Sequence, residues 1–234
     1  MNEQNEERAP AAELAELVMG EPLIAARVLS TVNSPLYGLR QPVTSIGQAV
    51  TFLGMNTVRS ICLQYMLADA FKPKDAETQR CFDAIWRASA IASELCVRLG
   101  KALNLPDQGS LATQVVLSFV GQLATASLIP ASGLRQWLSR GRLERARIEQ
   151  ELLGLSANEI GCLLMRAWDL PAALIDDVGA VGRQLITPFA SSAPQNAPRL
   201  ALAYLCARLG ERLAMGDLPS LDGYDPRQDT GPDT

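Results

Sequence analysis

One stretch decides the fold: Val32-Asn33-Ser34-Pro35-Leu36-Tyr37-Gly38-Leu39-Arg40-Gln41-Pro42-Val43-Thr44-Ser45-Ile46. It follows an apolar run, Leu23–Val32, and concentrates residues that end helices and form turns. Asn33 tolerates left-handed backbone, Gly38 permits a positive φ, and the two prolines prevent a helix from continuing. Ser45 can then cap a new helix. The stretch therefore predicts a packed corner between helices, with no obvious catalytic group.

Apolar residues at helical spacing continue on both sides of this corner. Leu14, Leu17 and Val18 fall at i, i+3 and i+4. The run Leu23–Val32 is too densely apolar for a helix that is buried on one side only. The sequence predicts helices over Ala11–Met19, Leu23–Val32, Ile46–Leu53 closed by Gly54, Thr57–Phe71 capped by Asn56, a long segment capped by Asp75 that runs to Leu99 and ends at Gly100, and Arg199–Met215.

These segments predict an all-α fold, a compact multi-helix bundle built as one body or as two helical lobes. A chain of 234 residues with 48% hydrophobic content can bury a real core. We expect a disordered N-terminus (1–10), a helical domain (11–215) and a disordered acidic tail (216–234). The helical domain would consist of two lobes, 11–71 and 75–215. Within it, Thr187–Pro198 is rich in Ser, Pro and Ala and should form a loop.

The absence of histidine from the whole sequence excludes several classes of enzyme. Histidine is the usual general base near neutral pH and the commonest nitrogen ligand of catalytic metals. Sites of the Ser-His-Asp and Cys-His types, and zinc sites that need histidine, are therefore excluded. We expect no cofactor.

Charge and cysteine content point to a cytoplasmic protein that would need a local basic patch to bind nucleic acid. The net charge of −4 gives no general attraction for phosphate backbones, which disfavours nucleic acid as a partner. Five widely spaced cysteines without a C-x-x-C pair suggest reduced, buried thiols. The polar, acidic N-terminus is unlike a signal peptide.

An uncharged segment, Gln108–Leu134, raises the question of a membrane span. Polar residues together with Gly121 and Pro130 dilute its hydrophobicity below that of a typical spanning helix. We predict a central helix that is enclosed by other helices. No membrane partner is expected.

The next segment, Leu134–Leu153, carries five arginines, which are Arg135, Arg140, Arg142, Arg145 and Arg147. Our interpretation is a solvated helix face with intrahelical charge pairs, because Glu144 lies among the arginines and Glu149 and Glu151 follow them. A patch that binds phosphate or a protein partner is the alternative.

Several of these stretches together resemble the HDOD domain, a family of bacterial signalling modules similar to HD-type phosphohydrolases but without their metal ligands. The resemblance is carried by the corner and the helices after it, with structural signature residues Asn33, Ser34, Pro35, Tyr37, Gly38, Ser45, Gly54 and Arg59. It implies an all-helical regulatory module. We interpret the signature side chains as structural locks, with a binding role for Asn33, Ser34, Tyr37 or Arg59 as the alternative.

The resemblance also indicates where HD enzymes hold their metal ligands. The corresponding residues here are Ala88, Ser118, Phe119, Ala157 and the pair Val181-Gly182. None of them offers an imidazole or a carboxylate. We therefore expect no catalytic residue and no metal ligand. Separately, Ala88, Ala92 and Cys96 keep one helix face small, so that another helix can approach closely.

Three hypotheses for function follow. The first is a noncatalytic regulatory module that acts by contact with a protein partner. The second is an enzyme with carboxylate ligands for magnesium, drawn from Glu149, Glu151, Glu159, Asp169, Asp176 and Asp177. The third is a pseudo-enzyme whose old cleft binds a nucleotide or second messenger without reaction, with phosphate held by Arg59, Arg87 or Arg166. We favour the first, and the third is the alternative.

Overall fold

The computed structural model describes residues 3–55, 57–58, 61–62, 73–184, 197–222 and 224–225, with the side chains of residues 3–9 left out. The described residues contain helices and no strand, so the predicted all-α fold is confirmed. The elements are α1 (Glu3–Met19), α2 (Pro22–Val32), the short 3-10 helix η1 (Pro35–Tyr37), α3 (Ile46–Leu53), α5 (Ala76–Ala102), α6 (Gln108–Leu117), α7 (Val120–Leu128), α8 (Ala131–Leu138), α9 (Arg142–Leu153), α10 (Ala157–Ala167), α11 (Ala172–Arg183) and α12 (Ala197–Met215).

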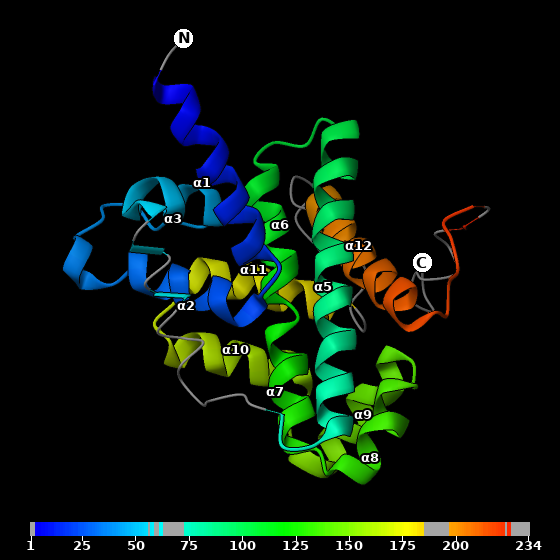
Figure 1. Cartoon of the computed structure of the whole chain (residues 1–234). Helices are drawn as coiled ribbons and strands as arrows, with labels where there is room; N and C mark the ends of the chain where they lie inside the picture. Colours follow the sequence, from blue (N-terminus) through cyan, green and yellow to red (C-terminus); the bar gives the residue numbers. More distant parts are fainter. Residues whose placement is uncertain are drawn as a thin grey trace.

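The helices pack around α5, which runs through the length of the molecule (Figure 1). Helix α12 crosses α5 on one side, α6 packs beside it, and α8 contacts its lower end. Helices α1 to α3 lie on the far side of α6 from α5. The buried apolar side chains form one continuous cluster from Leu14 in α1 to Ala207 in α12. Among the described residues, the helices therefore share a single core.

The contact between α5 and α12 depends on small residues. A Cβ atom placed on Gly210 of α12 would lie 2.4 Å from the carbonyl oxygen of Ala88 and 2.8 Å from the Cβ of Ala92. Ala88, Ala92 and Cys96 are all fully buried. The predicted small face of α5 therefore does receive another helix, at almost backbone-to-backbone distance.

The corner after α2 is held by the side chain of Asn33. Its Nδ2 donates to the carbonyl oxygens of Leu29 (2.9 Å) and Val43 (2.8 Å), and its Oδ1 accepts from the backbone N–H of Val43 (2.8 Å). Gly38 has φ +56°, a left-handed conformation. Ser45 caps α3 by accepting from the N–H of Gln48. The side chain of one turn residue thus fixes both ends of the corner.

Some helix boundaries differ from the sequence prediction. The backbone of residues 3–10 is helical and continues into α1, in contrast to the disordered N-terminus that we predicted. Acidic residues at the start of a helix interact favourably with its dipole, which supports this extension. Helix α5 also runs past Gly100 and stops at Ala102, followed by Asn104 in a left-handed conformation with φ +53°. Gly100 is buried against Gln108 and Leu202, so it serves packing instead of ending the helix.

The apolar segment Gln108–Leu134 is divided among α6, α7 and the start of α8. The break falls at Ser118, whose Oγ donates back to the carbonyl of Val115 at 2.6 Å. In the described part of the chain, Gln108–Leu128 is the one run long and apolar enough to cross a membrane, and 78% of its apolar window is buried inside the protein. This burial agrees with the predicted enclosed core segment.

Four predictions lie wholly or mainly outside the described residues. They are the Asn56 cap, most of the helix Thr57–Phe71 including Arg59, most of the loop Thr187–Pro198, and the end of the tail from residue 226.

Candidate functional site

A cleft of about 800 Å³ opens between four helices. Its walls come from the break between α6 and α7, from α9, from the first turns and outer face of α10, and from the end of α11. The lining residues are Ser118, Gln122, Arg142, Leu143, Arg145, Ala146, Arg147, Glu149, Gln150, Leu155, Ser156, Ala157, Asn158, Glu159, Cys162, Leu163, Arg166, Val181, Gly182 and Arg183. This volume lies within the range of small-molecule sites.

The cleft gathers most of the positions that the resemblance assigns to lost metal ligands. Ser118, Ala157 and the pair Val181-Gly182 all line it. Phe119 is fully buried and Ala88 is packed against α12, so these two do not reach the cleft. Residues distant in sequence thus converge on one cleft, although none offers an imidazole or a carboxylate.

Two glycines bring α7 and α10 into direct backbone contact beside the cleft. A Cβ atom on Gly121 would lie 1.8 Å from the carbonyl oxygen of Ala157, and one on Gly161 would lie 3.0 Å from the backbone nitrogen of Gly121. A real Cβ does not fit at Gly121 without a shift of the backbone. The contact therefore fixes the distance between two walls of the cleft.

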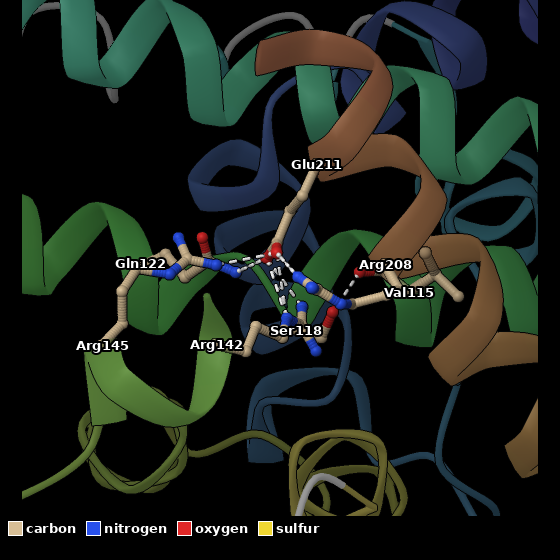
Figure 2. Close-up of polar contacts among 7 residues, drawn as sticks. All are labelled: Val115, Ser118, Gln122, Arg142, Arg145, Arg208 and Glu211. Atoms are coloured by element: carbon tan, nitrogen blue, oxygen red, sulfur yellow. Dashed lines mark hydrogen bonds and ion pairs between the residues drawn. The ribbon is translucent and has the colours of Figure 1, made fainter. Parts of the chain in front are cut away.

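The inner end of the cleft contains a buried cluster of charges around Glu211 of α12 (Figure 2). Arg142 donates to both carboxylate oxygens from Nε (3.0 Å each) and again from Nη2 at 2.8 Å. Arg145 Nη2 donates at 2.7 Å, Arg208 Nη1 at 3.3 Å and Gln122 Nε2 at 2.6 Å. One carboxylate thus joins α12 to α9 and α7.

The charges in this cluster shift one another's pKa values. Burial raises the pKa of Glu211, but the positive charges of Arg142 and Arg145 outweigh it and hold that pKa well below the ordinary range. Burial lowers the pKa of Arg142, and the opposing attraction of Glu211 leaves it above its ordinary value. Glu211 and Arg142 are therefore both ionised near neutral pH. Two arginines also lie over aromatic rings, Arg142 at 5.8 Å from the centre of Tyr204 and Arg145 at 5.5 Å from that of Trp137.

A second buried carboxylate, Glu149, joins α9 to the N-terminus of α10. It accepts from Trp137 Nε1 at 2.8 Å and from the backbone N–H of Ala157 at 2.6 Å. Glu159 closes the same helix end, because it accepts from the backbone N–H of Ser156 at 2.8 Å while Ser156 Oγ caps the helix. The protein's own carboxylates thus occupy this helix terminus.

The outer part of the cleft carries three more arginines. Arg147 and Arg166 are exposed and make no hydrogen bond or ion pair within the described part of the chain. Arg183 donates to the backbone carbonyl of Asp176 at 3.3 Å. Burial raises the pKa of the Cys162 thiol, and the positive charges of Arg183 and Arg166 partly oppose this. The guanidinium groups of Arg183 and Arg166 therefore both lie near Cys162, which lines the cleft.

The three arginines proposed from sequence fall in different places. Arg166 lines the cleft. Arg87 is exposed on α5 and does not line it. Arg59 lies outside the described residues.

The interpretation of the arginine-rich segment as a solvated face is wrong for two members. Arg145 is 4% exposed, and the Arg142 side chain is 12% exposed. Arg140 pairs with Glu144 at 3.6 Å, but it lies before the start of α9, so this pair is not within one helix. The segment is also two helices, α8 and α9, separated at residues 139–141. Sequence reasoning missed Glu211 as the common partner, because nothing local in a helix signals a charge pair with a segment more than sixty residues away.

The carboxylates considered for magnesium do not gather. Among the described residues, no group of three or more His, Cys, Asp or Glu side chains is placed to hold a metal ion. Glu149 and Glu159 are engaged in the hydrogen bonds given above. Asp177 accepts from Gln114 Nε2 at 3.1 Å, on the side of α11 that faces α6.

A family model of the HDOD domain matches residues 1–182, and this chain belongs to that family. The chain is similar to the MmoQ response regulator from Methylococcus capsulatus str. Bath, with 23% identity, a TM-score of 0.70, and coverage of 95% of this chain and 87% of that one. It is also similar to a virulence factor from Campylobacter jejuni subsp. jejuni, with 19% identity, a TM-score of 0.63, and coverage of 92% and 84%. At these identities the likeness shows a shared fold. No curated protein matches the sequence.

Proposed function

We propose that this protein is a noncatalytic signal-transduction module that acts in the bacterial cytoplasm by contact with a protein partner. One observation carries the proposal: the cleft where Ser118, Ala157 and Gly182 converge offers no imidazole or free carboxylate at those positions. The one buried carboxylate on its wall, Glu149, is already bound by Trp137 and by the N-terminus of α10. Membership of the HDOD family and the likeness to a response regulator support a role in signalling.

The catalytic alternative is tested by hydrolysis assays. Nucleotides and cyclic dinucleotides are incubated with the purified protein and Mg²⁺ or Mn²⁺, and compared with the double variant Asp176→Ala/Asp177→Ala. We expect product formation at the rate of the buffer control for both proteins. Turnover by the wild type that the double variant abolishes would contradict the proposal.

The protein contact is tested by affinity capture from the native cell with the whole chain as bait. A candidate partner counts only if reciprocal capture recovers this chain and the two purified proteins bind each other. We expect at least one partner to pass both steps. If no protein does, and if deletion of the gene changes no signalling output, the proposed mode of action is wrong.

A further inference from the structure

The cleft is positively charged although the chain as a whole is acidic. Five arginines line it against two carboxylates, Glu149 and Glu159, while the net charge of the protein is −4. Both carboxylates already accept hydrogen bonds from backbone or indole N–H groups. Local charge in a concave site attracts an oppositely charged small molecule more strongly than net charge would suggest.

Positive charge remains at the inner end of the cleft after internal pairing. Three guanidinium groups converge on the single carboxylate of Glu211. Arg142 donates hydrogen bonds to Glu211 from Nε and Nη2, whereas its Nη1 donates no hydrogen bond within the described residues. Arg145 has a buried Nη1 without a partner. Buried donors without acceptors are costly, so an anion or water that accepts from them would stabilise this end.

The outer end adds two guanidinium groups that are unpaired in the part of the chain that the structure describes. Arg147 and Arg166 belong to α9 and α10, on different walls, and neither has a hydrogen-bond or ion-pair partner among the described residues. The lining also includes the apolar side chains of Leu143, Leu155 and Leu163. The cleft thus combines guanidinium donors with apolar surface.

We propose that this cleft binds a small phosphorylated molecule of nucleotide size. The guanidinium fork fits phosphate oxygens, and a volume of about 800 Å³ admits a ligand of that size. Phosphate would be held by Arg147 and Arg166, with Arg142 Nη1 at the inner end, while the apolar part of the ligand packs on the leucines. The proposal deepens the proposed function, because a ligand held without turnover can serve as a signal to the module.

A purely structural role for the arginines is the competing explanation. It accounts for Arg142 and Arg145, which connect α9 to α12 through Glu211. It does not account for Arg147 or Arg166, because neither side chain makes a hydrogen bond or ion pair with another element among the described residues. Substitution of these two exposed side chains therefore separates ligand binding from folding.

The test is titration calorimetry and thermal shift with three probes: inorganic pyrophosphate, guanosine and guanosine diphosphate. We expect the diphosphate to bind more tightly than either fragment and to raise the melting temperature. Arg147→Ala and Arg166→Ala should each weaken binding about tenfold, which is the size of one lost charge-assisted hydrogen bond. Arg87→Ala is the matched control, because Arg87 is exposed on α5 and does not line the cleft. It should bind as the wild type does.

A second measurement uses neither the heat of binding nor the melting temperature. Bound diphosphate should slow the reaction of the Cys162 thiol, which lines the cleft, with a thiol reagent. The inference is overturned if no probe stabilises the protein at about 10 mM. It is equally overturned if Arg147→Ala and Arg166→Ala bind the diphosphate as tightly as Arg87→Ala.

The same samples distinguish this inference from the proposed function. Binding without hydrolysis agrees with both. Hydrolysis of the bound diphosphate contradicts the noncatalytic role and leaves the binding site in place. If no probe binds, the inferred ligand site is wrong, and the proposed function through protein contacts is unaffected.

Discussion

Gly121 and Ala157 touch through their backbones, so that a Cβ atom on Gly121 would lie 1.8 Å from the carbonyl oxygen of Ala157. Because the obstacle is backbone and not a flexible side chain, α7 and α10 must separate to admit even a methyl group. We predict that Gly121→Ala lowers the free energy of unfolding by about 2–4 kcal/mol. Urea denaturation followed by circular dichroism measures it.

Gly47 provides the matched control for that experiment. It lies in α3, is exposed, and has no atom within 4 Å of a Cβ built on it. Gly47→Ala should be neutral or stabilise the protein by up to about 1 kcal/mol, because alanine favours the helix. Equal losses in the two variants would show that the contact of α7 with α10 is not close.

The carboxylate of Glu211 forms ion pairs with Arg142, Arg145 and Arg208. Glu211→Gln leaves these charges buried without their counter-ion. We predict a loss of about 3–5 kcal/mol in the free energy of unfolding near neutral pH. Glu94→Gln removes an exposed partner of Arg98, and should cost no more than about 1 kcal/mol.

The same carboxylate predicts a pH dependence. The folded-state pKa of Glu211 lies below its ordinary value, so the folded protein binds fewer protons than the unfolded chain as the pH falls. Its stabilising contribution is complete above the unfolded pKa of about 4.3 and is lost progressively below it, toward the folded value. Unfolding curves from about pH 7 to pH 3 should therefore show the gap between wild type and Glu211→Gln narrowing only in the acid range. A constant gap over the whole range would contradict the depressed pKa.

Asn33 makes three hydrogen bonds that span the corner, one to Leu29 and two to Val43. Asn33→Ala leaves the backbone groups of Val43 without these partners. We predict a loss of about 2–3 kcal/mol, at a net value of about 1 kcal/mol for each bond. Ser34→Ala, at the next residue, should change stability by no more than about 0.5 kcal/mol, since no hydrogen bond from its side chain is present in the described structure. Similar losses in both variants would argue against a lock centred on Asn33.

Thiol chemistry should report the packing of the core. Burial raises the pKa of Cys81 to about 12, and a contact with Cys96 together with burial raises that of Cys206. Cys62 and Cys162 are half-buried. Titration with a coloured disulfide reagent near pH 8 should therefore modify at most these two in the folded state, and all five in denaturant. Rapid modification of Cys81 in the native protein would contradict the buried arrangement.

The sequence predicts the corner and the helices well, because their determinants are local. Asn33, Ser45 and Asp75 act on backbone groups within a few residues or across one turn, and apolar spacing marks the buried faces. The small face of α5 was also predictable from Ala88 and Ala92. The partner of that face, Gly210, was not, because it depends on how the chain returns after more than a hundred residues.

The charged part of the cleft could not be predicted from the sequence for a related reason. An arginine on an amphipathic helix has the same local pattern whether it faces water or a distant carboxylate. Arg145 pairs with Glu211 because the fold brings α12 to it, whereas Arg140, in the same segment, pairs with Glu144 on the surface. Arg166 was chosen from sequence as a residue that could meet phosphate, and the structure places it on the cleft, while Arg87 falls elsewhere. Whether any of them binds a ligand stays a prediction.

The close approach of Gly210 to Ala88 limits the side chains that position 88 can accept. A histidine ring at position 88 would need room that α12 fills, since the main chains already meet there. Ala88→His alone would therefore push apart α5 and α12, the two longest helices that the structure describes. A larger side chain at position 88 would require coordinated replacements on both helices, so each helix restricts the substitutions that the other can tolerate.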